Sequence, residues 1–106
     1  MPATSRLRKK WRRLLPSMAL KWTRTALRNL DDIAAFIAAD KPADATRFVQ
    51  ELRIATEKLL SFPGLGRAGR VPGTRELVLH TNYLAIYRVK AGEVEILRIH
   101  HAARLL

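Results

Sequence analysis

The amino-acid sequence predicts an α+β fold of the order β-α-α-β-β-β, in which a helix hairpin packs on one face of a small antiparallel sheet. Apolar residues recur every three or four positions between residues 26 and 62, the spacing of amphipathic helices. After Gly64 this period is lost, and short segments rich in Val, Ile, Leu and Tyr indicate strands. With 106 residues, 48% of them hydrophobic, the chain suits a single domain with one modest core.

A short strand over residues 19–22 is predicted to lead into the first helix. Thr23 or Thr25 is the expected N-cap, because a threonine hydroxyl accepts a hydrogen bond from a free backbone N–H of the first turn. Asp40, Lys41 and Pro42 should end this helix. Its apolar stripe consists of Ala26, Leu30, Ile33 and Ile37, widened by Leu27 and Ala34.

A second helix is predicted to begin at Pro42, because proline suits the first turn of a helix. Pro63 and Gly64 should end it. Its apolar positions follow one another at steps of three and four: Ala45, Phe48, Leu52, Ala55, Leu59 and Phe62. Because the turn between the helices is short, the two helices should form a hairpin.

A glycine-rich loop over residues 64–73 is expected to precede three antiparallel strands. His80, at the end of the first of these strands, is expected to be a turn residue. The strands are predicted over residues 76–80, 83–89 and 94–100, joined by turns at 81–82 and 90–93. The second face of the sheet should then be left partly open.

The charge of the chain favours an acidic protein or a polyanion as partner. The formal net charge is +11, from 20 Lys and Arg against nine Asp and Glu. Residues 1–17 hold six of the basic side chains and no acid, and we expect them to be a dispensable, disordered extension before a single domain at 18–106.

Several classes of protein are excluded by what the sequence lacks. Without cysteine there is no disulfide framework, thiolate nucleophile or thiolate zinc ligand, which is typical of a cytoplasmic protein. The sequence contains no apolar run of about 18 residues, so we expect neither a membrane-spanning helix nor a membrane as partner. Only three His are present, with no acid at ligand spacing, so we expect neither a metal nor a cofactor.

A pattern of many spaced positions extends over residues 19–104. It comprises Trp22, Asp31-Asp32 within the first helix, the Pro63 to Gly69 loop, and the runs GTRELVLHTNYLAIYRV and VEILRIHHAAR. This pattern resembles the RelE/ParE superfamily of toxins from type II toxin–antitoxin systems. The resemblance implies a small basic toxin that an antitoxin neutralises by wrapping around it. We therefore expect a tight complex with a short, acidic and apolar antitoxin.

The superfamily divides by target. RelE-type members cleave mRNA in the ribosome, where the RNA 2′-hydroxyl attacks the adjacent phosphate, whereas ParE-type members poison DNA gyrase without established nuclease chemistry. In an ungapped alignment, two RelE-type arginines fall at Leu84 and Ala102, so both are absent. A RelE-type lysine falls at Arg75, whose guanidinium is a poor base. We therefore expect a ParE-like gyrase poison, with a RelE-like mRNA endoribonuclease or a non-toxic, antitoxin-binding protein as alternatives.

The resemblance implies two sets of candidate site residues. If the protein is a nuclease, catalysis is expected from Arg75, Tyr87, His100 and His101. Contacts with the antitoxin or the target are expected from Arg67, Arg70, Arg75, Tyr83, Arg88, Arg98 and Arg104. The antitoxin should lie on the exposed face of the helix hairpin and on the basic strands, where Arg75 and Arg88 are placed to pair with carboxylates.

Strand periodicity predicts the direction of several of these side chains. Tyr83 and Tyr87 should share a packed face of the sheet, with their hydroxyls at its rim. Arg88 should project to the opposite face, where it either pairs with Glu76 or Glu95 or contacts a carboxylate of a partner.

Two further pairs of residues are distinguished by their positions. His100 and His101 are adjacent on a strand, so they should point to opposite faces and should not line one site together. Arg67 and Arg70 lie on the glycine-rich loop, where the sequence suggests less of a structural role for them than for the other candidate residues. We therefore expect them to contact a partner.

Overall fold

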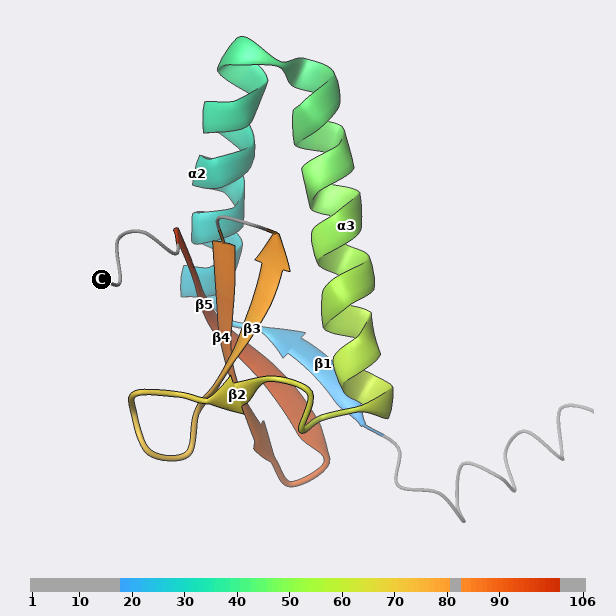
Figure 1. Ribbon diagram of the computed structural model, residues 1–106, viewed down its shortest axis with the longest axis vertical. Helices are drawn as coiled ribbons and strands as arrows, with labels where there is room; N and C mark the ends of the chain where they lie inside the picture. Colours follow the sequence, from blue (N-terminus) through green and yellow to red (C-terminus); the bar gives the residue numbers. More distant parts are fainter. Residues whose placement is uncertain (1–17, 81–82, 102–106) are drawn as a thin grey trace, which may run out of the picture.

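Two helices stand side by side on one face of a five-stranded sheet in the computed structural model, which describes residues 18–80 and 83–101 (Figure 1). The elements are β1 (Ala19–Trp22), α2 (Arg24–Asp40), α3 (Pro42–Ser61), β2 (Arg67–Ala68), β3 (Arg75–His80), β4 (Tyr83–Lys90) and β5 (Glu93–His101). The predicted α+β class and the helix hairpin are confirmed. The N-terminal extension at 1–17 lies outside the described residues.

The sheet is mixed, with the strand order β1-β5-β4-β3-β2. Strands β2 to β5 are antiparallel neighbours, as predicted for the last three strands, but β1 runs parallel to β5. The prediction of a purely antiparallel sheet is therefore wrong at one edge. The local pattern of four residues does not reveal a partner more than 70 residues away, because that pairing depends on where the helix hairpin returns the chain.

The glycine-rich loop contains an additional short strand. Arg67 and Ala68 of β2 pair with Glu76 and Arg75 of β3, so β3 begins one residue earlier than the sequence suggests. Two residues are too few for a strand period to be read from sequence.

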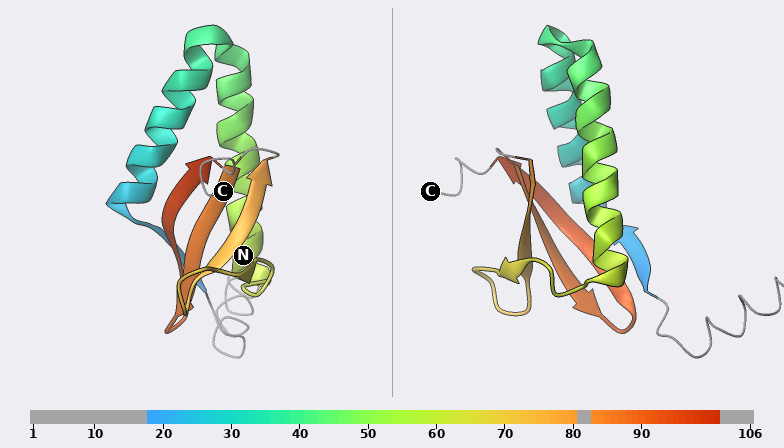
Figure 2. Two further views of the ribbon diagram at one scale, coloured as in Figure 1. Left: turned by 60° about the vertical axis from the view of Figure 1, so that its left-hand side comes forward. Right: turned by 45° about the vertical axis from the view of Figure 1, so that its right-hand side comes forward.

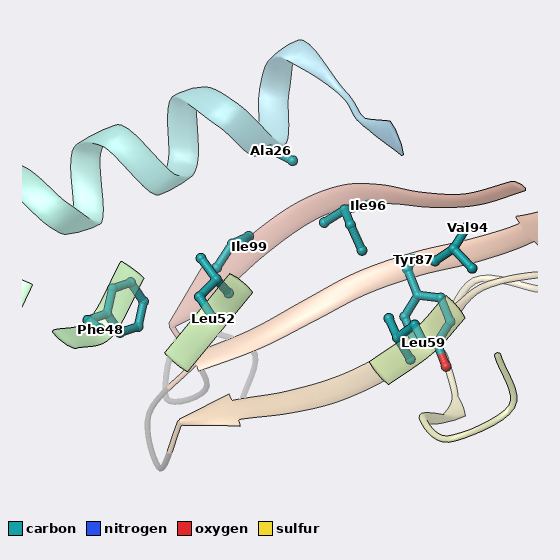
Figure 3. Close-up of a cluster of buried hydrophobic side chains, with 8 residues drawn as sticks. All are labelled: Ala26, Phe48, Leu52, Leu59, Tyr87, Val94, Ile96 and Ile99. Carbon is teal, nitrogen blue, oxygen red and sulfur yellow. The ribbon is translucent and has the colours of Figure 1, made fainter. Parts of the chain in front are cut away.

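The core lies between the helix hairpin and the sheet. Figure 3 shows eight buried side chains of this core, which come from both layers: Ala26, Phe48, Leu52, Leu59, Tyr87, Val94, Ile96 and Ile99. Successive inward positions of a strand are normally two apart, but Ile96 and Ile99 are three apart. The register of β4 and β5 shifts at this place, which leaves Leu97 as the extra residue of a β-bulge.

Two side chains at and near the start of α2 form hydrogen bonds with backbone groups of β5 beyond the part of this strand that pairs with β1. The Thr23 hydroxyl accepts from the N–H of Ala26, which confirms the first of the two predicted N-caps, and it donates to the Leu97 carbonyl at 2.8 Å. Asn29 Oδ1 accepts from the N–H of Ile99 at 3.1 Å. The N-cap and the second turn of α2 are therefore attached to the bulged part of β5.

The predicted apolar stripes are only partly buried. The turn between α2 and α3 stands clear of the sheet, so Ile33 and Ile37 are half-buried (Figures 1 and 2). Leu27 is 48% exposed, and Phe62 is 65% exposed because α3 ends at Ser61 and the chain turns away. Neither helix in the described part of the chain has the length and apolar content needed to cross a membrane.

Candidate protein-binding surfaces

The face of the sheet away from the helices is rich in cations. Directly paired strand residues point to the same face, and Tyr87 and Ile96 point to the helix side, so the alternate residues point outward. Both helices lie on the other face, as the right-hand view of Figure 2 shows. We call this surface the open face. Its basic side chains are Lys21, Arg67, Arg88, Lys90 and Arg98.

Acidic residues neutralise part of this charge. Arg88 Nε donates to Glu95 Oε1 at 2.6 Å, which confirms one of the two predicted ion-pair partners. Lys21 Nζ lies 2.9 Å from Glu93 Oε1, and this hydrogen bond raises the pKa of Lys21 above its ordinary value. Arg98 makes no ion pair with the residues that the structure describes, so it keeps an uncompensated positive charge.

Arg67 has a structural partner, contrary to the sequence-based interpretation. Its Nε and Nη2 atoms each lie 3.2 Å from Glu76 Oε1. The Glu76 side chain is buried, and β2 brings Arg67 opposite it in the sheet. The ion pair between Arg67 and Glu76 could not be predicted from the sequence, because the short strand β2 that aligns the two residues was not predicted.

Tyr87 lies in the core and not at a rim. Its side chain is 0% exposed, its hydroxyl donates to the Pro63 carbonyl at 2.7 Å, and the hydroxyl accepts from the N–H of Gly66 at 2.8 Å. The prediction of a rim hydroxyl is wrong for Tyr87, because the segment after α3 folds over this end of β4. A Cβ on Gly66 would lie 2.8 Å from both the Tyr87 ring and the Glu76 carbonyl, so glycine is needed for this close approach.

Arg75 lies where the loop becomes strand, as predicted, and its guanidinium contacts the same segment. Nη1 donates to the Gly66 carbonyl at 2.8 Å and lies 3.4 Å from the Gly64 carbonyl. Carbonyl oxygens do not neutralise the charge of Arg75. Arg70 is exposed and has no hydrogen bond or ion pair to any residue of the described ranges.

Tyr83 lies at the opposite end of β4 in a more open setting. Its ring is tilted on Phe48 with the centroids 4.9 Å apart, and it is nearly perpendicular to the His101 ring with the centroids 5.2 Å apart. A cavity of about 740 Å³ adjoins it, between α2 and the end of β5. Asn29 and Asp32 line this cavity from the helix.

His100 and His101 both line this cavity, so the prediction that they do not share a site is wrong. They belong to opposite faces of β5. However, β1 pairs with β5 only as far as Ile96, which leaves the edge of β5 toward α2 free of a neighbouring strand, and the cavity reaches both faces around that edge. Burial and the nearby charge of Arg98 both lower the pKa of His100.

The candidate catalytic residues divide between two parts of the sheet. Arg75, the first residue of β3, pairs with Tyr87 in the middle of β4, while His101 pairs with Tyr83 at the start of β4. Tyr83 and Tyr87 are four residues apart on the strand, a distance of about 13 Å. Arg104 and Ala102 lie outside the described residues. Within those residues, no three His, Asp or Glu side chains are grouped as metal ligands.

A second hollow crosses the helix hairpin. It has a volume of about 300 Å³. The sequence did not reveal it, because its lining residues come from β1, α2 and α3, which only the folded chain brings together. Exposed Leu27 lies in this groove, which explains why this apolar residue is not in the core. We call it the hairpin groove, and its lining is Leu20, Trp22, Leu27, Leu30, Val49, Leu52, Arg53, Thr56 and Glu57.

Comparisons with known proteins agree with this fold. The family of the ParE toxin of the type II toxin–antitoxin system, parDE, matches residues 20–106. The chain is 44% identical over 84 residues to the Putative toxin Y4kP of Sinorhizobium fredii, covering 78% of this chain and 86% of that protein. It is 39% identical over 84 residues to Toxin RelE2 of Caulobacter vibrioides, covering 79% and 94%.

Similar solved structures support the same family. One belongs to the chromosomal ParDE system from P. aeruginosa, with 36% identity, a TM-score of 0.74, and coverage of 82% of this chain and 98% of that chain. A chain of the toxin–antitoxin complex RelBE2 from Mycobacterium tuberculosis shares the fold, with 24% identity, a TM-score of 0.56, and coverage of 80% and 98%. Since the family match extends over most of the sequence and the architecture agrees, this chain belongs to the ParE toxins of type II toxin–antitoxin systems, within the RelE/ParE superfamily.

Proposed function

We propose that this toxin binds and poisons DNA gyrase without chemistry of its own, and that a cognate antitoxin neutralises it. One observation carries the proposal: the residues expected for nuclease catalysis do not converge. Arg75 and Tyr87 pair four residues along β4 from Tyr83, whereas His100 and His101 pair with Leu84 and Tyr83 at the start of that strand. RNA cleavage through the 2′-hydroxyl needs a base and a phosphate-binding cation around one scissile bond.

The environments of individual residues support the same proposal. The buried hydroxyl of Tyr87 already donates to one backbone group and accepts from another, so it has no free donor to offer a substrate. Leu84, which stands at the position of a RelE-type arginine, is itself buried. Both DNA gyrase and its alternative, the ribosome, would place the toxin in the cytoplasm.

A direct test compares two reactions of the purified toxin. We expect inhibition of plasmid supercoiling by DNA gyrase, and intact mRNA on programmed ribosomes. The His100→Gln and His101→Gln variants should retain inhibition, because neither histidine is assigned to the gyrase contact. Cleaved mRNA together with uninhibited gyrase would overturn the proposal, and absence of growth arrest on expression would favour a non-toxic, antitoxin-binding protein.

The ribonuclease remains the second candidate because of the cavity between α2 and β5. It gathers Tyr83, His100 and His101, which together offer a phenol and two imidazoles for proton transfer. A nuclease that uses this cavity should lose mRNA cleavage in the His101→Ala variant. Arg70→Ala, at the other end of the sheet, should leave that cleavage unchanged.

We further propose that the antitoxin covers the hairpin groove and the open face. The groove is apolar, whereas the open face carries the uncompensated charge of Arg98 beside the Arg88–Glu95 ion pair, so an apolar segment and an acidic segment of one antitoxin would match both surfaces. Leu27→Asp places a charge in the groove and should weaken the complex with the product of the neighbouring gene. Arg47→Glu, on the exposed surface of α3, is the matched control.

Co-expression followed by affinity capture and a sizing column measures this complex. We expect the toxin and the neighbouring gene product to elute together, and the Leu27→Asp variant to release free toxin. Wild-type toxin that elutes alone from the co-expressed mixture would contradict the assignment of the partner.

A further inference from the structure

We infer that the segment after α3 carries the surface that contacts the target, and that the occupant of this surface is an acidic protein surface with apolar pockets. We call this surface the loop patch, made of Phe62, Leu65, Arg70 and Val71. Arg75 and Tyr87 are positioning residues that hold the patch in shape. This assignment rests on the proposed function, since it presumes that the toxin acts by binding a protein.

Exposed apolar side chains concentrate on this segment. Eight large hydrophobic residues of the described ranges are exposed, and three of them fall between residues 62 and 71. Phe62 is 65% exposed, Leu65 is 52% exposed and Val71 is 64% exposed. Keeping such side chains in water is unfavourable, and several exposed large apolar side chains along one short segment are a reason to expect a protein contact there.

The charge of the segment defines the chemistry of its partner. Residues 62–75 include three arginines and no acid. Glu76 neutralises Arg67, but Arg75 contacts only carbonyl oxygens, and Arg70 has no partner in the described chain. Two uncompensated guanidinium groups beside exposed apolar side chains match carboxylates around an apolar pocket.

A protein fits this patch better than a nucleic acid. Leu65 and Val71 are aliphatic and have no ring on which a base could stack, so only Phe62 would serve that purpose. Arginine and aromatic side chains surrounded by apolar contacts are typical of the residues that dominate protein–protein affinity.

Several hydrogen bonds hold the segment in one conformation. The Tyr87 hydroxyl joins the Pro63 carbonyl to the N–H of Gly66, and Arg75 holds the Gly66 carbonyl. The turn at its far end is closed by the N–H of Gly69, which donates to the Thr74 carbonyl at 2.8 Å. Gly73 adopts a φ of 85°, which favours glycine. A segment that is ordered before binding loses less conformational entropy when it binds.

The patch itself is tested with the double variant Phe62→Ala/Leu65→Ala and with Arg70→Glu. The matched controls are Ile54→Ala and Arg47→Glu, which change an exposed aliphatic and an exposed cation on α3. We measure the toxin concentration that half-inhibits purified DNA gyrase, the affinity for the antitoxin, and growth arrest on expression. Each patch variant should need roughly tenfold more toxin, with antitoxin affinity changed less than about twofold, and the controls should match wild type.

The positioning role is tested with Tyr87→Phe, which keeps the ring and removes the hydroxyl. Hydrogen exchange at the Gly66 amide should become faster, and inhibition of gyrase should weaken while the circular dichroism spectrum is unchanged. Arg70→Glu should weaken inhibition without changing exchange at Gly66, because Arg70 makes no contact that holds the segment.

Each other outcome contradicts a specific part of the inference. Wild-type potency in both patch variants would exclude the patch as the target contact. An equal loss of antitoxin affinity would make it an antitoxin surface. Binding of duplex DNA by the toxin alone, lost in Arg70→Glu, would make the occupant a nucleic acid. If wild-type toxin leaves gyrase active, the proposed target is wrong; growth arrest lost only in the patch variants would then still support the patch, and unchanged arrest would overturn it.

Discussion

Tyr83 and Tyr87 lie on one strand, four residues apart, and point to the same face of the sheet, yet they have different roles. Tyr87 is covered by the segment after α3 and uses its hydroxyl to hold that segment. Tyr83 is half-buried and lies between the rings of Phe48 and His101 beside an open cavity. Two residues of identical chemistry and strand phase therefore differ because a distant part of the chain covers only one of them.

The largest expected effect on stability comes from replacing each tyrosine by alanine, which tests this comparison directly. Tyr87→Ala should lower the free energy of unfolding by about 3–5 kcal/mol, because it removes a fully buried ring and leaves a cavity. Tyr83→Ala should cost about 1–2 kcal/mol, because its ring is only half-buried. Urea denaturation monitored by circular dichroism measures both values, and equal losses would contradict the difference between the two ends.

Substitutions at Gly66 test how closely the segment after α3 packs on Tyr87. A methyl group at this position would press on the Tyr87 ring and the Glu76 carbonyl, so Gly66→Ala should cost about 1–3 kcal/mol. Gly64→Ala is the control, because a Cβ at Gly64 meets no atom within 4 Å, and its effect should stay within about 0.5 kcal/mol. Thermal unfolding of the two variants side by side would reveal a loosely packed loop if Gly66→Ala proved harmless.

Asn29 gives the corresponding test at the Tyr83 end. Asn29→Ala removes the acceptor for the N–H of Ile99 and should cost about 1–2 kcal/mol of unfolding free energy. Asn29→Asp keeps an acceptor oxygen and should be closer to wild type. Denaturation curves for the two variants check this order, and the reverse order would show that the contact with β5 is unimportant.

The smallest expected effect is the contribution of His100 to the pH dependence of stability. Its pKa lies below the ordinary value of 6.5 in the folded protein, because burial and the charge of Arg98 disfavour the protonated form. The unfolded chain therefore binds this proton more readily, so stability is retained above pH 6.5 and falls as the pH drops from there toward the folded pKa. His100→Gln should flatten that part of the stability profile, measured by urea denaturation between pH 7 and pH 5, and an unchanged slope would assign it to other groups.

Sequence patterns predicted much of the fold and little of the site. The helices, the Thr23 cap and the last three strands were predictable because each depends on residues within one turn or one strand period. The start of a strand at Arg75 follows a local pattern in the same way, and the pairing of Arg88 with Glu95, one of two partners expected, joins neighbouring strands of a hairpin.

The sequence by itself determined the α+β class, the basic charge and the resemblance to RelE/ParE toxins, because these follow from local period, composition and spacing. Tertiary structure alone decided that β1 runs parallel to β5, that Tyr87 holds the segment after α3, and that Arg67 pairs with Glu76. It also placed His100 and His101 beside one cavity. These features join residues far apart in the chain, and the free energy that selects them comes from packing and hydrogen bonds that exist only once the helices and the sheet have assembled.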